Sequence, residues 1–218
     1  MDIRWIPGFA DYGEIYAMQE EMAIARAQDA SLEDELLLME HESVYTIGRT
    51  RDHSSLHPAT LLPHPVFEIN RGGQATYHGP GQLVGYPIVN LNRFGRDLHD
   101  YILSLEDTLI RTCASFGVKS SLKEGLVGVW VGDKKIASIG VGIKKWITMH
   151  GFAINIMPES LPPFGYITPC GIDGVQMTCL TDEMGGGYIP DLIHTFGNRF
   201  ATLWERLVAE KIQLTASY

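Results

Sequence analysis

Residues 126–156 constrain the fold of this chain more than any other stretch. They contain three apolar runs, LVGVWV, KKIASIGVGI and WITMHGFAINI, with only short polar breaks between them. Gly132-Asp133 at the first break is a dipeptide typical of hairpin turns, and Lys144-Lys145 marks the second. Strands joined by such short turns pair antiparallel, because parallel neighbours need a longer connection. The sequence therefore predicts a β-meander here.

The spacing of apolar residues elsewhere predicts helices and further strands. Apolar residues recur at helical intervals in three segments, residues 12–27, 98–116 and 189–208. Asp97 is suited to cap the second helix and Gly117 to end it, and Cys113 falls inside its apolar stripe as a core residue. Shorter apolar runs predict strands over residues 2–6, 35–41, 43–48, 66–70 and 83–91. We expect the first strand to end at Pro7-Gly8.

Residues 70–86, NRGGQATYHGPGQLVGY, are unusually rich in glycine and polar side chains and lie between two predicted strands. Glycine costs backbone entropy, which is tolerable where a ligand or a second backbone must come close. His78-Gly79 in this stretch recurs as His150-Gly151 in the meander, which indicates that two strands converge on one cleft. The stretch is therefore either a pair of strands joined by glycine turns or the floor of a ligand site.

Common phosphate-binding and metal-binding motifs do not fit the chain. A Walker loop needs a lysine after its second glycine, and none stands at that spacing in the glycine-rich stretch. The dinucleotide fingerprint G-x-G-x-x-G fails because Gly79, Gly81 and Gly85 are one residue out of step. His53 and His57 would suit a metal on a helix, but the proline after His57 favours a loop. We therefore expect no metal site.

The chain of 218 residues carries a net charge of −9, and residues 1–42 account for all of it, with 11 acids against Arg4 and Arg26. A protein without a basic face is a poor nonspecific binder of nucleic acid. Local basic clusters occur at Arg49 and Arg51, at Lys134 and Lys135, and at Lys144 and Lys145. Each is either solvated surface or a docking point for a small acidic partner.

The cysteine count and the hydropathy place further limits on the protein. Three cysteines are an odd number without metal-ligand spacing, which argues against a disulfide framework. No apolar run is long enough to span a bilayer, and the first residues lack the basic head and apolar stretch of a secretory signal. We expect a cytosolic monomer with one domain, residues 1–218, that binds neither nucleic acid nor a membrane.

Cys170 and Lys135 are the residues whose setting suggests chemistry. Cys170 stands between Pro169 and Gly171, on a turn that favours a displayed thiol, although an ordinary buried thiol is the alternative. A thiol needs a cation or a base beside it to react at neutral pH. Lys135 opens the second strand of the meander and is a candidate for that group, although a solvated edge lysine is the common finding there.

Four motifs together resemble the lipoate-protein ligase B family, whose members are octanoyltransferases. They are R-G-G-Q-A-T-Y-H-G-P-G-Q at residues 71–82, K-I-A-S-I-G at 135–140, H-G-F-A-I-N at 150–155 and P-C-G-I at 169–172. They stand in order, and the resemblance spans most of the chain. It implies an α+β fold, a mixed β-sheet core with packed helices, as in the catalytic domains of biotin and lipoate protein ligases.

The resemblance also implies a reaction and the residues that perform it. An octanoyl or lipoyl group passes from the thioester of acyl carrier protein to a lysine of lipoyl domains in 2-oxoacid dehydrogenases and of the glycine cleavage H protein, with no cofactor. This is the first step of lipoic acid assembly. The family's acyl-thioester cysteine corresponds to Cys170 and its partner lysine to Lys135. The residues that match its substrate-binding segments are Arg71, Gly72, Gly73, Gln74, Ala75, Thr76, Tyr77, His78, Ser138, Ile139, Gly140, Gly151, Phe152 and Ala153.

Other interpretations stay open at the level of the sequence. An ATP-dependent lipoate or biotin ligase of the same fold would hold an acyl-adenylate on the glycine stretch, and Cys170 would be incidental. A non-catalytic module would bind acylated carrier proteins or a small carboxylate without transferring anything. A metal hydrolase built on His53, His57 and His78 is a further alternative, which zinc analysis would test.

Overall fold

The computed structural model of the chain describes residues 1–49, 51, 53–56, 62–172, 174–185 and 189–215, with Cys170 and Thr215 described by their backbone only. The main sheet has the strand order β1-β2-β6-β10-β9-β8-β7, and β11 pairs with β9. Its strands are β1 (Asp2–Ala10), β2 (Glu35–His41), β6 (Gln82–Ile88), β7 (Ser121–Lys123), β8 (Leu126–Val131), β9 (Lys134–Lys144), β10 (Ile147–Asn155) and β11 (Gln176–Met177).

The main sheet is mixed. β1 runs parallel to β2 and β11 runs parallel to β9, whereas the other neighbours pair antiparallel. The β8-β9-β10 meander predicted from the sequence is confirmed, with Gly140 of β9 opposite Gly151 of β10. A second, smaller sheet has the order β4-β3-β5 and consists of β3 (Val44–Ile47), β4 (Val66–Glu68) and β5 (Thr76–His78).

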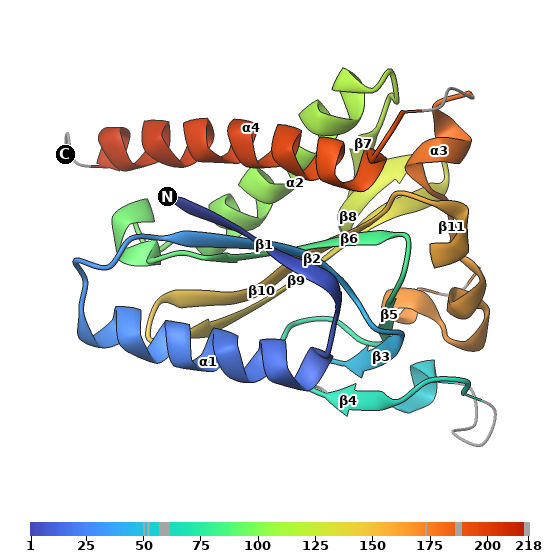
Figure 1. The fold of residues 1–218 in the computed structure, drawn as a ribbon, viewed down its shortest axis with the longest axis horizontal. Coiled ribbons are helices and arrows are strands. Elements are labelled where there is room, and N and C mark those ends of the chain that lie inside the picture. The colour runs from blue at the N-terminus through green and yellow to red at the C-terminus, as the bar shows by residue number, and fades with distance from the viewer. Residues whose placement is uncertain (50, 52, 57–61, 173, 186–188, 216–218) are drawn as a thin grey trace.

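Helices cover both faces of the main sheet (Figure 1). α2 (Leu98–Ser115) and α4 (Leu192–Thr215) lie on one face, and α1 (Tyr12–Gln28) lies on the other with the small sheet beside it. β2 shows why both faces are apolar, because its buried leucines alternate: Leu38 packs in the core under α2 and α4, and Leu37 packs in the core under α1. Among the described residues the other helical pieces are α3 (Leu180–Glu183) and the 3₁₀ turns His53–Ser55, Leu91–Phe94, Pro158–Ser160, Pro162–Tyr166 and Pro169–Gly171.

The predicted helix over residues 98–116 is confirmed, including its cap, since the Asp97 carboxylate accepts a hydrogen bond from the backbone N–H of Asp100 at 2.9 Å. Cys113 is fully buried, as predicted. The end of the first strand was predicted wrongly. β1 continues past Pro7-Gly8 because a shift of register between Trp5 and Phe9 absorbs the two residues.

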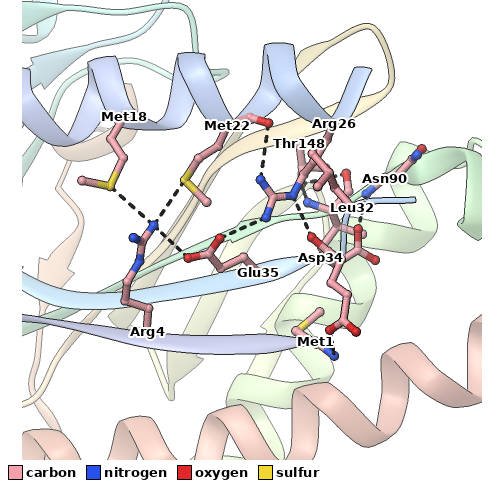
Figure 2. Close-up of polar contacts among 12 residues, drawn as sticks. Met1, Arg4, Met18, Met22, Arg26, Leu32, Asp34, Glu35, Asn90 and Thr148 are labelled. Atoms are coloured by element: carbon pink, nitrogen blue, oxygen red, sulfur yellow. Dashed lines mark hydrogen bonds and ion pairs between the residues drawn. The ribbon is translucent and has the colours of Figure 1, made fainter. Parts of the chain in front are cut away.

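A polar network anchors α1 and β1 to the edge of the sheet (Figure 2). The Glu35 carboxylate on β2 receives Arg4 from β1 at 2.8 Å and Arg26 from α1 at 3.0 Å. Asp34 next to it accepts a hydrogen bond from the backbone N–H of Asn90 at 2.9 Å. The two arginines bracket one carboxylate, so the three elements are held together at this end. Tyr12 opens the same helix at its other end.

Several expected features can be compared with the part of the chain that the structure describes. None of its helices is long and apolar enough to cross a membrane. Within these same residues no group of three or more histidine, cysteine or acidic residues is arranged to hold a metal ion. His53 instead meets Glu68 at 3.0 Å, and His57 lies outside the described residues.

Candidate functional site

A pocket lies where β5, β6, β9 and β10 meet the first turn of α1. Its cavity volume is about 40 Å³. Its wall is apolar at Ile139, Phe152 and Ala153 and polar on the side of the glycine-rich stretch. The full set of lining residues is Tyr12, Arg71, Gly73, Thr76, His78, Tyr86, Ser138, Ile139, Gly140, His150, Gly151, Phe152 and Ala153.

Two glycines bring the backbones around this pocket together. A Cβ atom on Gly140 would lie 3.0 Å from Cδ of Arg71 and 3.2 Å from the carbonyl oxygen of Gly72. A Cβ atom on Gly151, opposite Gly140 in the sheet, would lie 2.3 Å from the carbonyl oxygen of Gly85. The absence of side chains here therefore allows the Arg71 segment to lie directly on the sheet.

Arg71 is buried at the polar end of the pocket. Its guanidinium donates hydrogen bonds to the carbonyl oxygen of Thr46 at 2.9 Å, to the hydroxyl of Thr46 at 2.7 Å and to the carbonyl oxygen of Gly72 at 2.9 Å. These bonds fix the planar group, because each uses a different direction of its fork. The arginine therefore supplies a positive charge in a set position.

The pocket's two histidines are neutral. Burial, together with the charge of Arg71, lowers the pKa of His150 to about 3. Burial, with smaller contributions that include His41 and Arg71, holds the pKa of His78 well below its usual value. His41 behind them has its pKa lowered to about 4, again chiefly by burial. All three rings thus act as uncharged hydrogen-bonding groups near neutral pH.

Lys135 is 1% exposed, although lysine is rarely buried. Its Nζ donates to the carbonyl oxygen of Val127 at 3.0 Å and lies 5.4 Å from the centre of the Trp130 ring. Burial raises the pKa of the nearby Glu106 carboxylate, although a hydrogen bond from the N–H of Gly128 at 2.8 Å and the charge of Lys135 partly oppose this shift. Lys135 is therefore a buried lysine and not a solvated one at the edge of the sheet.

The backbone of Cys170 lies in the 3₁₀ turn Pro169–Gly171, as the sequence predicted for a turn. The turn packs against the glycine-rich stretch, since a Cβ atom on Gly171 would overlap the side-chain amide of Gln74. A few residues further on, Met177 of β11 pairs in register with Lys135 of β9. The side chain of Cys170 lies outside the described part of the chain, and with it the predicted contact between its sulfur and Lys135.

Comparison with known proteins assigns a family to this geometry. The family model for the lipoyl protein ligase A/B catalytic domain matches residues 11–201. The chain belongs to this family. A protein named octanoyltransferase from Geobacter sulfurreducens is 49% identical over 80% of this chain and 72% of its own length. Another of that name from Geobacter sp. strain M21 is 44% identical over 88% of this chain and 92% of its own.

Solved structures support the fold. A lipoate-protein ligase A bound with ATP matches with a TM-score of 0.70 at 13% identity, over 100% of this chain and 93% of its own. Biotin protein ligase from Aquifex aeolicus matches with a TM-score of 0.52 at 13% identity, over 98% of this chain and 72% of its own. The resemblance stated from the motifs and the biotin and lipoate ligase fold that it implied are thus confirmed.

Most of the substrate-binding residues expected for a lipoyl protein ligase A/B domain line the pocket. Those that do not are Gly72, Gln74, Ala75 and Tyr77. Gly72 bonds through its N–H to Val141 of β9 at 3.1 Å, and Tyr77 turns its hydroxyl to Ser43 at 2.9 Å. Lys135 also lies outside the lining, whereas Ser138 on the same strand is part of it.

Three lining residues of this lipoyl protein ligase A/B domain, Tyr12, Tyr86 and His150, were not among those expected. His150 has a left-handed backbone with φ of 58°, and its ring Nδ1 is buried with no hydrogen-bond partner among the described residues. The repeated imidazole-glycine pair was a signal for His150. Nothing local marks Tyr12, because only the packing of α1 brings it to the pocket.

Proposed function

We propose that this chain is an octanoyltransferase that forms a thioester between the octanoyl group and Cys170. Its relatives at 44–49% identity carry the name octanoyltransferase, so the chain is an acyltransferase of octanoyl groups. An octanoyl chain in the apolar part of the pocket gains roughly 0.8 kcal/mol per buried methylene, or about 5 kcal/mol in all. That is enough to hold the group.

The proposed donor is octanoyl acyl carrier protein, and the proposed acceptors are lipoyl domains of 2-oxoacid dehydrogenases and of the glycine cleavage H protein. A fold neighbour from Thermoplasma acidophilum is a bipartite lipoate protein ligase studied with its E2 lipoyl domain, which supports an acceptor of this kind. A thioester donor brings its own activation, so no ATP is required. We propose that residues 1–218 act as one domain and as a monomer.

In the first half of the reaction, Lys135 takes the proton of Cys170, and the thiolate attacks the carbonyl carbon of the donor thioester. A new carbon–sulfur bond to Cys170 forms as the donor's carbon–sulfur bond breaks. The departing thiolate takes the proton back from Lys135 and leaves as a thiol. Lys135 thus holds the proton only while the sulfur reacts.

In the second half, the uncharged amine of the acceptor lysine attacks the carbonyl carbon of the Cys170 thioester. An amide bond forms, the bond to Cys170 breaks, and the proton lost by the amine returns through Lys135 to the cysteine sulfur. The enzyme is then in its starting state. The same two residues therefore serve both halves, as nucleophile and as proton carrier.

The observation that carries this proposal is the burial of Lys135 beside the Trp130 ring and the Val127 carbonyl. A fold needs no buried amine at this point, and a buried lysine is rare in folded proteins.

The test is to mix the protein with octanoyl acyl carrier protein without an acceptor and to measure its intact mass. We expect an octanoyl increment that is absent in Cys170→Ser and formed slowly in Lys135→Met. Release of AMP from ATP and free lipoate, with no increment from the thioester, would assign the chain to the ATP-dependent ligases instead.

A further inference from the structure

His78 is a buried imidazole of the pocket that the proton transfers above do not use. It lines the pocket from β5 and stacks on the Tyr12 ring, with ring centres 5.9 Å apart. Its Nδ1 atom lies 2.8 Å from Oε1 of Gln82. Which of the two ring nitrogens carries the proton decides whether His78 offers the substrate a donor or an acceptor.

A chain of hydrogen bonds that ends on a backbone carbonyl determines the position of this proton. The carbonyl oxygen of Thr178 can only accept, so the group of Asn155 that faces it at 3.0 Å is Nδ2. Asn155 therefore turns Oδ1 toward Gln82, whose Nε2 donates to it at 3.0 Å. Gln82 is left with Oε1 facing the imidazole. An amide oxygen cannot donate, so the proton of His78 lies on Nδ1 and the lone pair lies on Nε2.

The other end of this series of hydrogen bonds is fixed by β9, the strand that carries Lys135. The N–H of Thr178 donates to the carbonyl oxygen of Lys135 at 3.0 Å. Gln82 of β6 and Asn155 of β10 are partners in the register of the main sheet. Both amides are buried, so water does not compete for their hydrogen bonds. Neither amide can turn over without leaving a buried group unsatisfied.

We propose that Gln82 and Asn155 are positioning residues that hold His78 as its Nδ1–H tautomer, so that Nε2 accepts a hydrogen bond from an uncharged N–H group of the substrate. This inference rests on the proposed octanoyl transfer. The octanoyl chain itself has no N–H group. The donor is therefore either an amide of the carrier's prosthetic arm or the amine of the acceptor lysine.

The charges around the ring favour an uncharged donor over a cation. Burial and the nearby His41 and Arg71 lower the pKa of His78, so the ring is neutral and its lone pair is available. The Arg71 guanidinium repels a second cation in the same pocket. An amide N–H or a neutral amine can donate to the neutral ring without being repelled by Arg71, whereas an ammonium group cannot.

The tautomer can be measured by nitrogen NMR of the histidine rings, with the His78 signals assigned from a His78→Gln variant. We expect Nδ1 to be protonated and Nε2 to be unprotonated at pH 7 in the natural protein. An Nε2–H tautomer or a doubly protonated ring would overturn the proposal.

Two substitutions at Gln82 test whether this residue sets the tautomer of His78. Gln82→Met removes the acceptor for Nδ1, so we expect a mixture of tautomers. Gln82→Glu places a carboxylate beside Nδ1, so we expect the whole ring to become protonated closer to neutral pH. The control is Gln28→Glu, at the exposed glutamine that ends α1. The His78 signals should not change in this control. Unchanged His78 signals in both Gln82 variants would contradict the role proposed for Gln82.

The source of the N–H group is tested in a Cys170→Ala protein, which cannot form the thioester. It is titrated separately with octanoyl pantetheine, with ethyl octanethioate, which has no N–H group, and with a lipoyl domain. A shift of the Nε2 signal with octanoyl pantetheine identifies the carrier arm, and a shift with the lipoyl domain identifies the lysine amine. A shift with ethyl octanethioate, or with none of the three, overturns the proposed contact.

The tautomer of His78 can be tested independently of octanoyl transfer. If the natural protein formed no acyl-enzyme, the proposed function would fail while the tautomer measurement still stood. If the acyl-enzyme formed normally, we expect Gln82→Met to slow one half of the reaction by roughly tenfold. Normal rates in both halves despite an altered tautomer would overturn the role assigned to His78.

Discussion

Gly128 and Lys135 occupy neighbouring strands so closely that a single added carbon would displace the lysine. A Cβ atom on Gly128 would lie 2.6 Å from the carbonyl oxygen of Ala137, 2.6 Å from Cε of Lys135 and 3.1 Å from Nζ of Lys135. The glycine also has φ of +127°, a conformation that side chains rarely adopt. The place of the buried amine therefore depends on the absence of a side chain one strand away.

We expect Gly128→Ala to slow formation of the acyl-enzyme on the order of 100-fold, because the lysine amine and the β9 backbone at Ala137 must move from their positions. The measurement is the rate of octanoyl mass gain in a single turnover. Gly132→Ala is the matched control, since Gly132 also has a positive φ but nothing within 4 Å of its Cβ position. Equal loss in the two variants would mean that the positive φ, rather than contact with Lys135 and the Ala137 carbonyl, is the cause.

Gly140→Ala should weaken binding of the octanoyl thioester while the protein remains folded. The new methyl group meets Cδ of Arg71 at 3.0 Å, so the arginine must shift within the pocket. Overpacking of this kind costs about 1 to 3 kcal/mol, which corresponds to roughly a tenfold rise in KM or more. Gly165→Ala serves as control because its Cβ position is open. An unchanged KM in Gly140→Ala would argue that the substrate does not use this pocket.

The buried histidines should make the protein less stable in acid. The pKa of His41 is lowered to about 4, whereas an unfolded histidine titrates near 6.5, so the unfolded state binds the proton first. This contribution to stability is fully present above about pH 6.5 and is lost as the pH falls toward about 4.

The expected slope is about 1.4 kcal/mol of unfolding free energy per pH unit for each such histidine. Urea unfolding between pH 4.5 and 7.5 measures it. His41→Gln should reduce the slope, whereas His99→Gln, at an exposed histidine, provides the comparison. A slope unaffected by His41→Gln would show that other groups cause the acid sensitivity.

Asp97→Ala should lower stability by about 1 kcal/mol without affecting octanoyl transfer, because the carboxylate caps α2, and none of the pocket-lining residues lies on this helix. Thermal or urea unfolding measures the loss of stability, and the rate of acyl-enzyme formation measures the effect on octanoyl transfer. Asp107→Ala, which removes an exposed pair with Arg111, should cost less. A fall in acylation rate of Asp97→Ala at temperatures where it is folded would contradict this separation.

Local patterns were sufficient for much of the fold. The meander followed from short turns between apolar runs, and α2 followed from its apolar stripe and from Asp97 at its start. Where a long-range contact competed with a local signal, the sequence was a poor guide. Pro7-Gly8 looks like the end of a strand, but pairing with β2 carries β1 through it.

The sequence by itself determined the family, the order of the strands in the meander and the glycine-rich wall of the pocket, because these depend on residues close together in the chain. Only the tertiary structure decided that Lys135 is buried, that Tyr12, Tyr86 and His150 line the pocket, and that a carbonyl at Thr178 directs the proton on His78. Those features depend on contacts between distant segments, which determine burial and hydrogen-bond direction and which no local pattern records.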